Sequence, residues 1–138
     1  MKLPHITLYT KQVSGGKALT FISLINPKYR DDEGLHEHEK THILHNWCFA
    51  LVSAIGLLTW AQLDETNATY AYWALAVCPF IGNFVHLVSR RFRLWAEVKA
   101  YRVQLRYSPQ HLHHFVRFLV DNYNLKINDN KAKRLLIC

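Results

Sequence analysis

Histidine and glutamate gather in one short segment, residues 36–42, which reads His-Glu-His-Glu-Lys-Thr-His. Within it, residues 38–42 form the pattern HExxH. On a helix, residues four apart lie about 6 Å apart on one face, so His38 and His42 can bind one tetrahedral zinc ion. Glu39 is rotated from His38 by about 100°. We expect its carboxylate beside the ion, where it can accept a proton from a water that zinc has acidified.

A catalytic zinc ion needs a third protein ligand and an open fourth position. His45 is one candidate, but three ligands from one straight helix converge poorly on a single ion. Glu97, which lies in an amphipathic segment at residues 92–107, is the better candidate. Its alternative role is that of a surface residue paired with Arg93, four positions earlier.

Distances along the chain support Glu97. If residues 35–63 and 70–107 form an antiparallel helical hairpin, the centre of the histidine pair lies about 40 Å before the loop and Glu97 about 46 Å after it. This mismatch is about one helical turn. A break at Pro79 and Gly82 can absorb it, because proline interrupts a helix.

The elements that must position these residues follow from the patterns around them. Residues 6–10 and 18–25 are rich in β-branched and aromatic residues and flank a turn signal at residues 14–17, which predicts a two-stranded antiparallel hairpin within residues 1–26. The helical patterns predict an HExxH helix that runs into a first apolar helix (31–63), a second apolar helix that runs into the helix of Glu97 (70–107), and C-terminal helices (110–138). The expected fold is therefore mainly α with a small N-terminal β-hairpin and one long antiparallel α-hairpin, in a single domain of residues 1–138.

Two stretches of this α-hairpin, residues 46–63 and 70–89, carry no charged residue. Their lengths of 18 and 20 residues match what a bilayer core requires, and Trp and Tyr residues cluster near their ends. The connecting loop is acidic, whereas Arg90, Arg91 and Arg93 follow the second stretch, so the positive-inside rule places both termini in the cytoplasm. A hairpin buried in a soluble protein or in an assembly gives the same pattern.

The composition narrows the choice of partners. Half of the residues are apolar, which excludes a disordered chain, and the formal net charge is +7. The basic residues are scattered and form no recognised nucleic-acid-binding motif, so we do not expect a nucleic-acid partner. Residues 1–17 have no apolar signal-peptide core, and we expect no export by a cleaved signal.

The HExxH motif, two apolar helices and then a helix carrying Glu-x-x-Ala resemble the gluzincin zinc peptidases. The order is similar to a reduced form of the integral-membrane heat-shock and CAAX-processing proteases. Residues 29–35, 91–102 and 132–136 also resemble small phage and bacterial proteins described as metallopeptidases. The resemblance implies zinc ligation by His38, His42 and Glu97 and a general-base role for Glu39.

The resemblance also implies two features that the motif does not contain. Gluzincins align an extended substrate along the edge strand of a sheet, a role that would fall to residues 18–25. They also use a Tyr or His to stabilise the transition state. Tyr101, four residues after Glu97, is the first candidate, although packing is the role that we favour for it. The alternatives are His111, His113 and His114.

The sequence thus predicts a zinc-dependent metallopeptidase that acts on a protein or peptide substrate, and the resemblance implies that a phage or a bacterium encodes it. We expect it to be associated with a membrane or carried in a phage virion. The alternative is a non-catalytic structural protein of a membrane or virion, in which HExxH is a structural zinc site or a relic.

Overall fold

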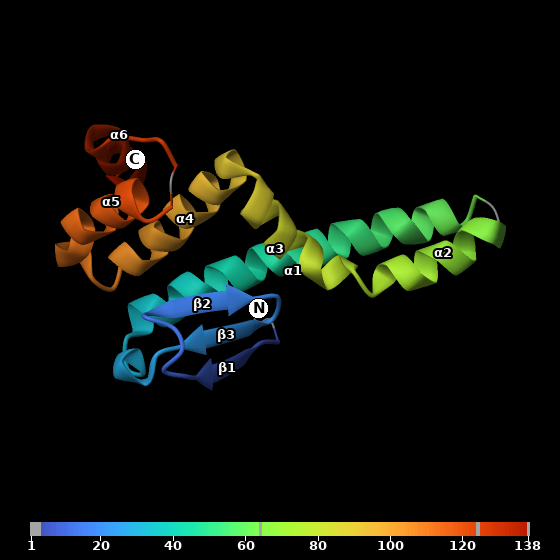
Figure 1. The fold of residues 1–138 in the computed structure, drawn as a ribbon, viewed down its shortest axis with the longest axis horizontal. Helices are drawn as coiled ribbons and strands as arrows, with labels where there is room; N and C mark the ends of the chain where they lie inside the picture. Colours follow the sequence, from blue (N-terminus) through green and yellow to red (C-terminus); the bar gives the residue numbers. More distant parts are fainter. Residues whose placement is uncertain (1–3, 64, 124, 138) are drawn as a thin grey trace.

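The computed structural model describes residues 4–63, 65–123 and 125–137. This part of the chain is mainly helical, with a small sheet near the N-terminus (Figure 1). The elements are β1 (Ile6–Tyr9), β2 (Gly16–Leu19), β3 (Ile22–Ile25), α1 (Glu33–Ala61), α2 (Glu65–Leu75), α3 (Cys78–Val88), α4 (Arg90–Leu105), α5 (Leu112–Asp121) and α6 (Asp129–Ile137). The predicted fold class is confirmed, because the long helix α1 packs against α2, α3 and α4.

The strand pairing differs from the prediction. The sheet has three strands in the order β1-β3-β2, with β2 antiparallel and β1 parallel to β3. The predicted antiparallel pairing of residues 6–10 with 18–25 is therefore wrong. Residues 18–25 turn back at Thr20, which adopts a left-handed φ of 55°. Asn46 donates to the carbonyl of Thr20, and Asn83 donates to its hydroxyl, so contacts with two helices fix a turn that the local pattern does not indicate.

Helix α1 is the continuous element that carries the HExxH motif. The carboxylate of Asp32 accepts a hydrogen bond from the N–H of Leu35 at 2.9 Å and so caps its start. With 29 residues the helix is about 43 Å long. Its buried residues all precede residue 51: Gly34, His38, Glu39, Ile43, Asn46 and Ala50. The first half of α1 therefore belongs to the body of the protein, whereas the second half projects from it (Figure 1).

The return limb of the α-hairpin is broken in two places. The expected break at Pro79 and Gly82 is displaced, because α2 ends at Leu75 and α3 begins at Cys78. Pro79 lies in the first turn of α3, where its missing N–H is tolerated, and the axis bends by 68° between α2 and α3. A second break falls at Ser89, whose hydroxyl caps α4. The region 70–107 is therefore part of three helices rather than one kinked helix.

A small hydrophobic core joins α4 to the two C-terminal helices. It comprises Val98, Tyr101, Phe115, Val116, Leu119, Leu125, Ala132 and Leu136. Helix α5 begins at Leu112, after a turn of 3-10 helix at Pro109–His111, and ends at Asp121. The predicted C-terminal helices are thus present, and they hold α4, the helix of Glu97, from the side opposite α1 (Figure 1).

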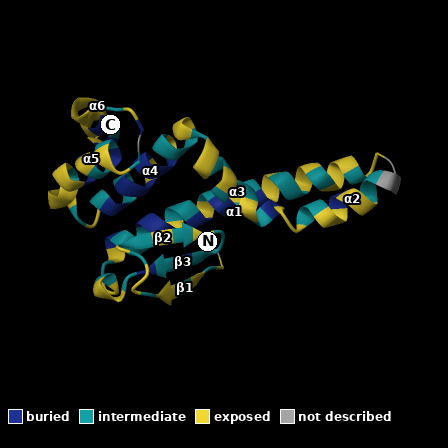
Figure 2. Cartoon of the chain, in the orientation of Figure 1, coloured by how far each residue is buried: buried dark blue, intermediate teal, exposed yellow. Residues whose placement is uncertain are grey.

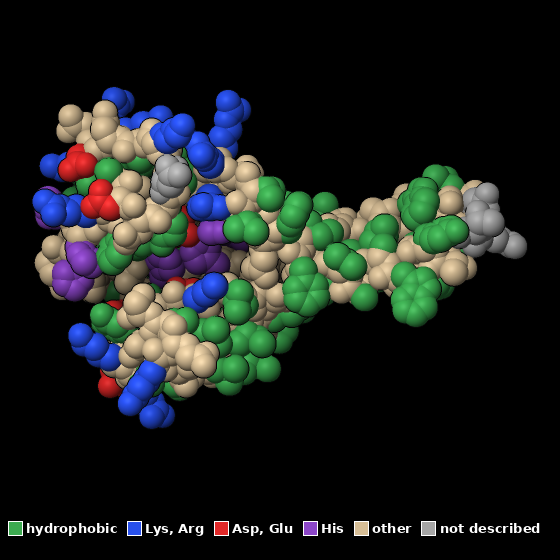
Figure 3. All heavy atoms as spheres, viewed as in Figure 1, with side chains coloured by type: hydrophobic (Ala, Val, Ile, Leu, Met, Phe, Trp, Pro, Cys, Tyr) green, Lys and Arg blue, Asp and Glu red, His purple; other side chains and the backbone are tan. Residues whose placement is uncertain are grey.

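Residues 47–63 and 65–81 form an arm that we call the projecting hairpin. Burial is concentrated in the body and sparse along this arm, whose surface is largely apolar (Figures 2 and 3). Its exposed large hydrophobic residues are Leu51, Val52, Ile55, Leu58, Trp60, Leu63, Tyr70, Tyr72, Trp73, Val77 and Phe80. By length and composition, α1 could cross a membrane, and α2 with α3 could do so if the bent pair is one span.

Candidate metal centre

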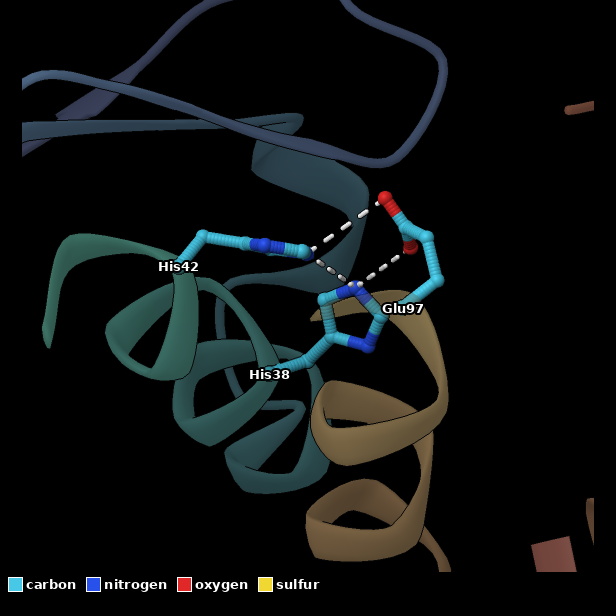
Figure 4. A group of neighbouring side chains, drawn as sticks. All are labelled: His38, His42 and Glu97. Carbon is cyan, nitrogen blue, oxygen red and sulfur yellow. Dashed lines mark hydrogen bonds and ion pairs between the residues drawn. The ribbon is translucent and has the colours of Figure 1, made fainter. Parts of the chain in front are cut away.

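The centre forms where α1 meets α4. His38 and His42 project from α1 toward Glu97 on α4, and ligand atoms of the three side chains all lie within 4.8 Å of one another (Figure 4). The Nε2 atoms of the two histidines are 3.2 Å apart. Glu97 Oε2 lies 3.7 Å from Nε2 of His38, and Oε1 lies 3.6 Å from Nε2 of His42. The structure thus brings together the three predicted ligands, although Glu97 lies 55 residues after His42 in the sequence.

The donor set fits a zinc ion. Two imidazole nitrogens and one carboxylate oxygen are ligands that zinc accepts, and three protein ligands leave a fourth position open. The side chains of His38 and Glu97 are only 6% and 4% exposed. Oε2 of Glu97 is buried and makes no hydrogen bond with any described residue. A buried carboxylate oxygen without a donor is costly, and a cation between the three side chains would satisfy it.

The electrostatics of the three side chains are coupled. Burial lowers the pKa of His38 to about 3, helped by the neighbouring His42. Burial also acts to lower the pKa of His42, but the contact with Glu97 and its negative charge outweigh this effect, so the pKa is raised. Burial acts to raise the pKa of Glu97, yet interactions with His42 and His86 lower it overall. Glu97 is therefore ionised at neutral pH, as a metal ligand must be.

Glu39 lies in the wall of a cavity of about 260 Å³ that also contains the three candidate ligands. Its side chain is turned toward β2, where it interacts with the backbone N–H of Ala18. Burial raises the pKa of Glu39 to about 7, although the nearby His42 opposes this shift. A carboxylate with such a pKa, beside the ligands but outside their cluster, is suited to accept and return a proton.

Strand β2 forms another wall of the cavity through Gly16, Lys17 and Ala18. This strand is an edge of the sheet, because it pairs only with β3 in the order β1-β3-β2. The cavity therefore lies between an edge strand and the HExxH helix. In Figure 3, histidine side chains lie at the bottom of the hollow between the sheet and the C-terminal helices.

Tyr101, the first candidate for transition-state stabilisation, lies in the core behind the cluster. Its ring packs edge-on against His38 with a centroid distance of 4.5 Å and stacks on Phe115. Its hydroxyl is 3.1 Å from the hydroxyl of Tyr123, and it is Tyr123 that lines the cavity and interacts with Glu97.

The remaining histidine candidates occupy other places. The rings of His111 and His114 pack on Phe115 and Phe118, and neither they nor His113 line the cavity. His45 does line the cavity, but its ring packs on Trp95 and it does not belong to the ligand cluster.

Sequence reasoning missed one site residue that carried a usable signal. His86 on α3 lines the cavity, and its Nε2 is 3.1 Å from Oε1 of Glu97. Asn83 precedes it by three residues, so the two polar side chains share one face of an otherwise apolar segment. That spacing predicts that this face of the segment is turned toward a polar site. In the structure, the face carries His86 to Glu97 and Asn83 to Asn46. Tyr123 had no comparable signal.

Comparison of the chain with protein-family models, with curated proteins and with solved structures found no match. Its function is therefore inferred from the chemistry of the site itself.

Proposed function

We propose that this chain is a zinc-dependent metallopeptidase. The observation that carries the proposal is the convergence of His38, His42 and Glu97 in a cavity whose wall also holds Glu39. When bound, zinc would lower the pKa of a water and polarise a peptide carbonyl. Glu39 would accept the proton of the attacking water and return it to the leaving amine.

The edge strand supports a peptide as the substrate. Gly16, Lys17 and Ala18 of β2 line the cavity, and β2 has one unpaired edge in the described sheet. An extended peptide could add to this edge through backbone hydrogen bonds and so pass over the ligand cluster. Residues 16–19, rather than the whole of 18–25, are the segment that we propose for this role.

The test combines metal content with hydrolysis. Wild-type protein purified with zinc should hold close to one ion per chain by mass spectrometry and cleave a quenched fluorescent peptide library. Glu39→Gln should keep its zinc and lose at least about 100-fold in rate, which is the size expected for a general base. Glu97→Ala should lose most of its zinc, because the cluster loses its only anionic ligand.

Glu37→Ala is the matched control for Glu97. Glu37 lies on α1 and pairs with Lys40 at the surface, so its removal should change neither zinc content nor rate. Folded wild type without zinc, or Glu39→Gln with full activity, would overturn the proposal.

A second candidate is a non-catalytic membrane or virion protein with a structural zinc site. The observation that favours it is the projecting hairpin, whose apolar surface no described residue covers. Zinc bound at one per chain with no hydrolysis of any library peptide would support this candidate.

For both candidate functions, we propose that the projecting hairpin inserts into a lipid bilayer with both termini in the cytoplasm. Its first limb is helical from Trp47 to Ala61 and rises about 22 Å, which is most of the roughly 30 Å thickness of a bilayer core. Arg90 and Arg91 lie at the start of α4, on the body side of the hairpin, where they suit anionic headgroups. A virion assembly that covers the same surface is the competing location.

A further inference from the structure

Of the cavity-lining histidines, His86 brings a ring nitrogen closest to the carboxylate of Glu97. Its Nε2 lies 3.1 Å from Oε1, and its ring meets that of His42 edge-on at a centroid distance of 5.5 Å. The side chain is 31% exposed, so it reaches the cluster from the rim of the cavity. An ionised carboxylate can only accept, so the ring nitrogen is the donor in this hydrogen bond.

Helix α3 holds His86 in place through its packing on α1. A Cβ atom at Gly82 would sit 2.4 Å from Oδ1 of Asn46, so only glycine allows the two helices to approach this closely. The amide of Asn46 also donates to Oδ1 of Asn83 at 3.1 Å. At the other end of α3, Nε of Arg93, which lies in the first turn of α4, donates to the carbonyl of His86 at 2.9 Å. The backbone of His86 is thus fixed from both sides.

The two oxygens of Glu97 have different surroundings. Oε1 accepts the hydrogen bond from His86, whereas Oε2 makes none and faces Nε2 of His38. If His86 were absent, the carboxylate could turn about its terminal bond, out of the plane in which one oxygen faces Nε2 of His38. A donor on one oxygen therefore fixes the direction in which the other is presented.

We infer that His86 is a positioning residue of the metal centre: by holding Oε1 of Glu97 it presents Oε2 to the ion bound by His38 and His42. His86 is not itself a ligand, since the cluster of mutually close ligand atoms consists of the other three residues. This inference rests on the proposed metal site but not on peptide hydrolysis. Partners that orient metal ligands typically contribute 10–100-fold to metal affinity.

The experiment measures zinc affinity by competition with a chromogenic chelator, in wild type and three variants. His86→Ala should weaken zinc binding by about 10–100-fold while one ion per chain still binds at saturation. His86→Gln keeps a side-chain N–H donor and should recover most of the affinity. His45→Ala is the control, because His45 lines the same cavity but packs on Trp95. Its affinity should stay within about threefold of wild type.

X-ray absorption of the zinc-loaded proteins separates positioning from ligation. Wild type and His86→Ala should both show two histidine nitrogens on zinc. Three in wild type and two in the variant would make His86 a ligand and overturn the inference, as would unchanged affinity in His86→Ala with an unchanged metal-free melting temperature. Wild type that binds no zinc would overturn both this inference and the proposed function. If wild type binds zinc and the variants show the affinity losses given above, but no peptide is cleaved, only the proposed function is overturned.

Discussion

Glu39 lies so close to the backbone of Gly16 that residue 16 has no space for a side chain. A Cβ atom there would sit 2.3 Å from Oε1 of Glu39. Gly15, the preceding residue, has open space at the same position. Neither glycine adopts a positive φ, so the two differ in their surroundings rather than in their backbone requirements.

Gly16→Ala should therefore displace the proposed base, whereas Gly15→Ala should not. We expect Gly16→Ala to lower kcat/KM at least tenfold and the free energy of unfolding by about 1–3 kcal/mol, the usual cost of overpacking. Peptide hydrolysis and thermal unfolding of the two variants, measured side by side, check this. Equal behaviour of the two variants would show that the contact between Gly16 and Glu39 does not matter.

The sequence predicted the three candidate ligands because their positions follow from simple periodicity. The i, i+4 spacing of His38 and His42 places them together on any helix, and chain length alone brought Glu97 to the same level of the hairpin. The spacing of Asn83 and His86 marks a polar face, but the contact of His86 with Glu97 depends on the bend before α3, and the place of Tyr123 depends on the return of the chain after α5. Local spacing records neither the bend nor the return.

Among the elements, α3 packs tightly on the helix of the HExxH motif at Gly82. A Cβ atom at Gly82 would meet both Oδ1 of Asn46 and, at 3.0 Å, its backbone Cα. Gly56, in the projecting half of α1, has open space instead. The separation between α1 and α3 is therefore set at one point, and the polar contacts of Asn46 and Asn83 depend on it.

Gly82→Ala should push α3 away from α1. We expect it to lower the free energy of unfolding by about 1–3 kcal/mol, because the backbone of Asn46 cannot yield as a flexible side chain could. Gly56→Ala should be neutral or stabilise by up to about 1 kcal/mol, since alanine favours an exposed helix interior. Chemical denaturation of both variants tests this. A Gly82→Ala variant as stable as wild type would mean that the two helices adjust freely.

Element by element, helices were predicted more accurately than strand pairing. The apolar patterns placed helices at residues 31–63 and 92–107, close to the observed α1 and α4, although the break at Ser89 was not predicted. The turn at Thr20 instead depends on Asn46 and Asn83, which lie 26 and 63 residues away. The pairing of β1 with β3 could not be read from residues 6–25 alone, because nothing in that segment records these distant contacts.

For the whole molecule, the dominant feature is the contrast between a basic body and an arm whose two ranges contain one charged residue, Glu65 (Figure 3). Val52 and Phe80 on the projecting hairpin are 70% and 58% exposed, so polar replacements there leave the folded body intact. Ile137 on α6 is 62% exposed and offers a matched position on the body.

The variant with Val52→Asp and Phe80→Asp should lose membrane binding. Each charge at bilayer depth costs about 2.5–3.5 kcal/mol. Wild type and Ile137→Asp should float with phosphatidylcholine vesicles containing phosphatidylglycerol, and the double variant should stay in the aqueous fraction. Wild type that remains soluble and monodisperse without lipid would instead favour an assembly partner for the hairpin.

The two limbs of the hairpin connect to the site in different ways. Helix α1 runs without a break from His38 to the end at Ala61, whereas the chain from α2 to Glu97 passes the interruptions at residues 76–77 and at Ser89. In mechanical terms, α1 is a stiff lever and the return limb is a jointed linkage. A sideways force on the tip would reach the histidine pair directly but would reach the carboxylate only after two joints had absorbed part of it.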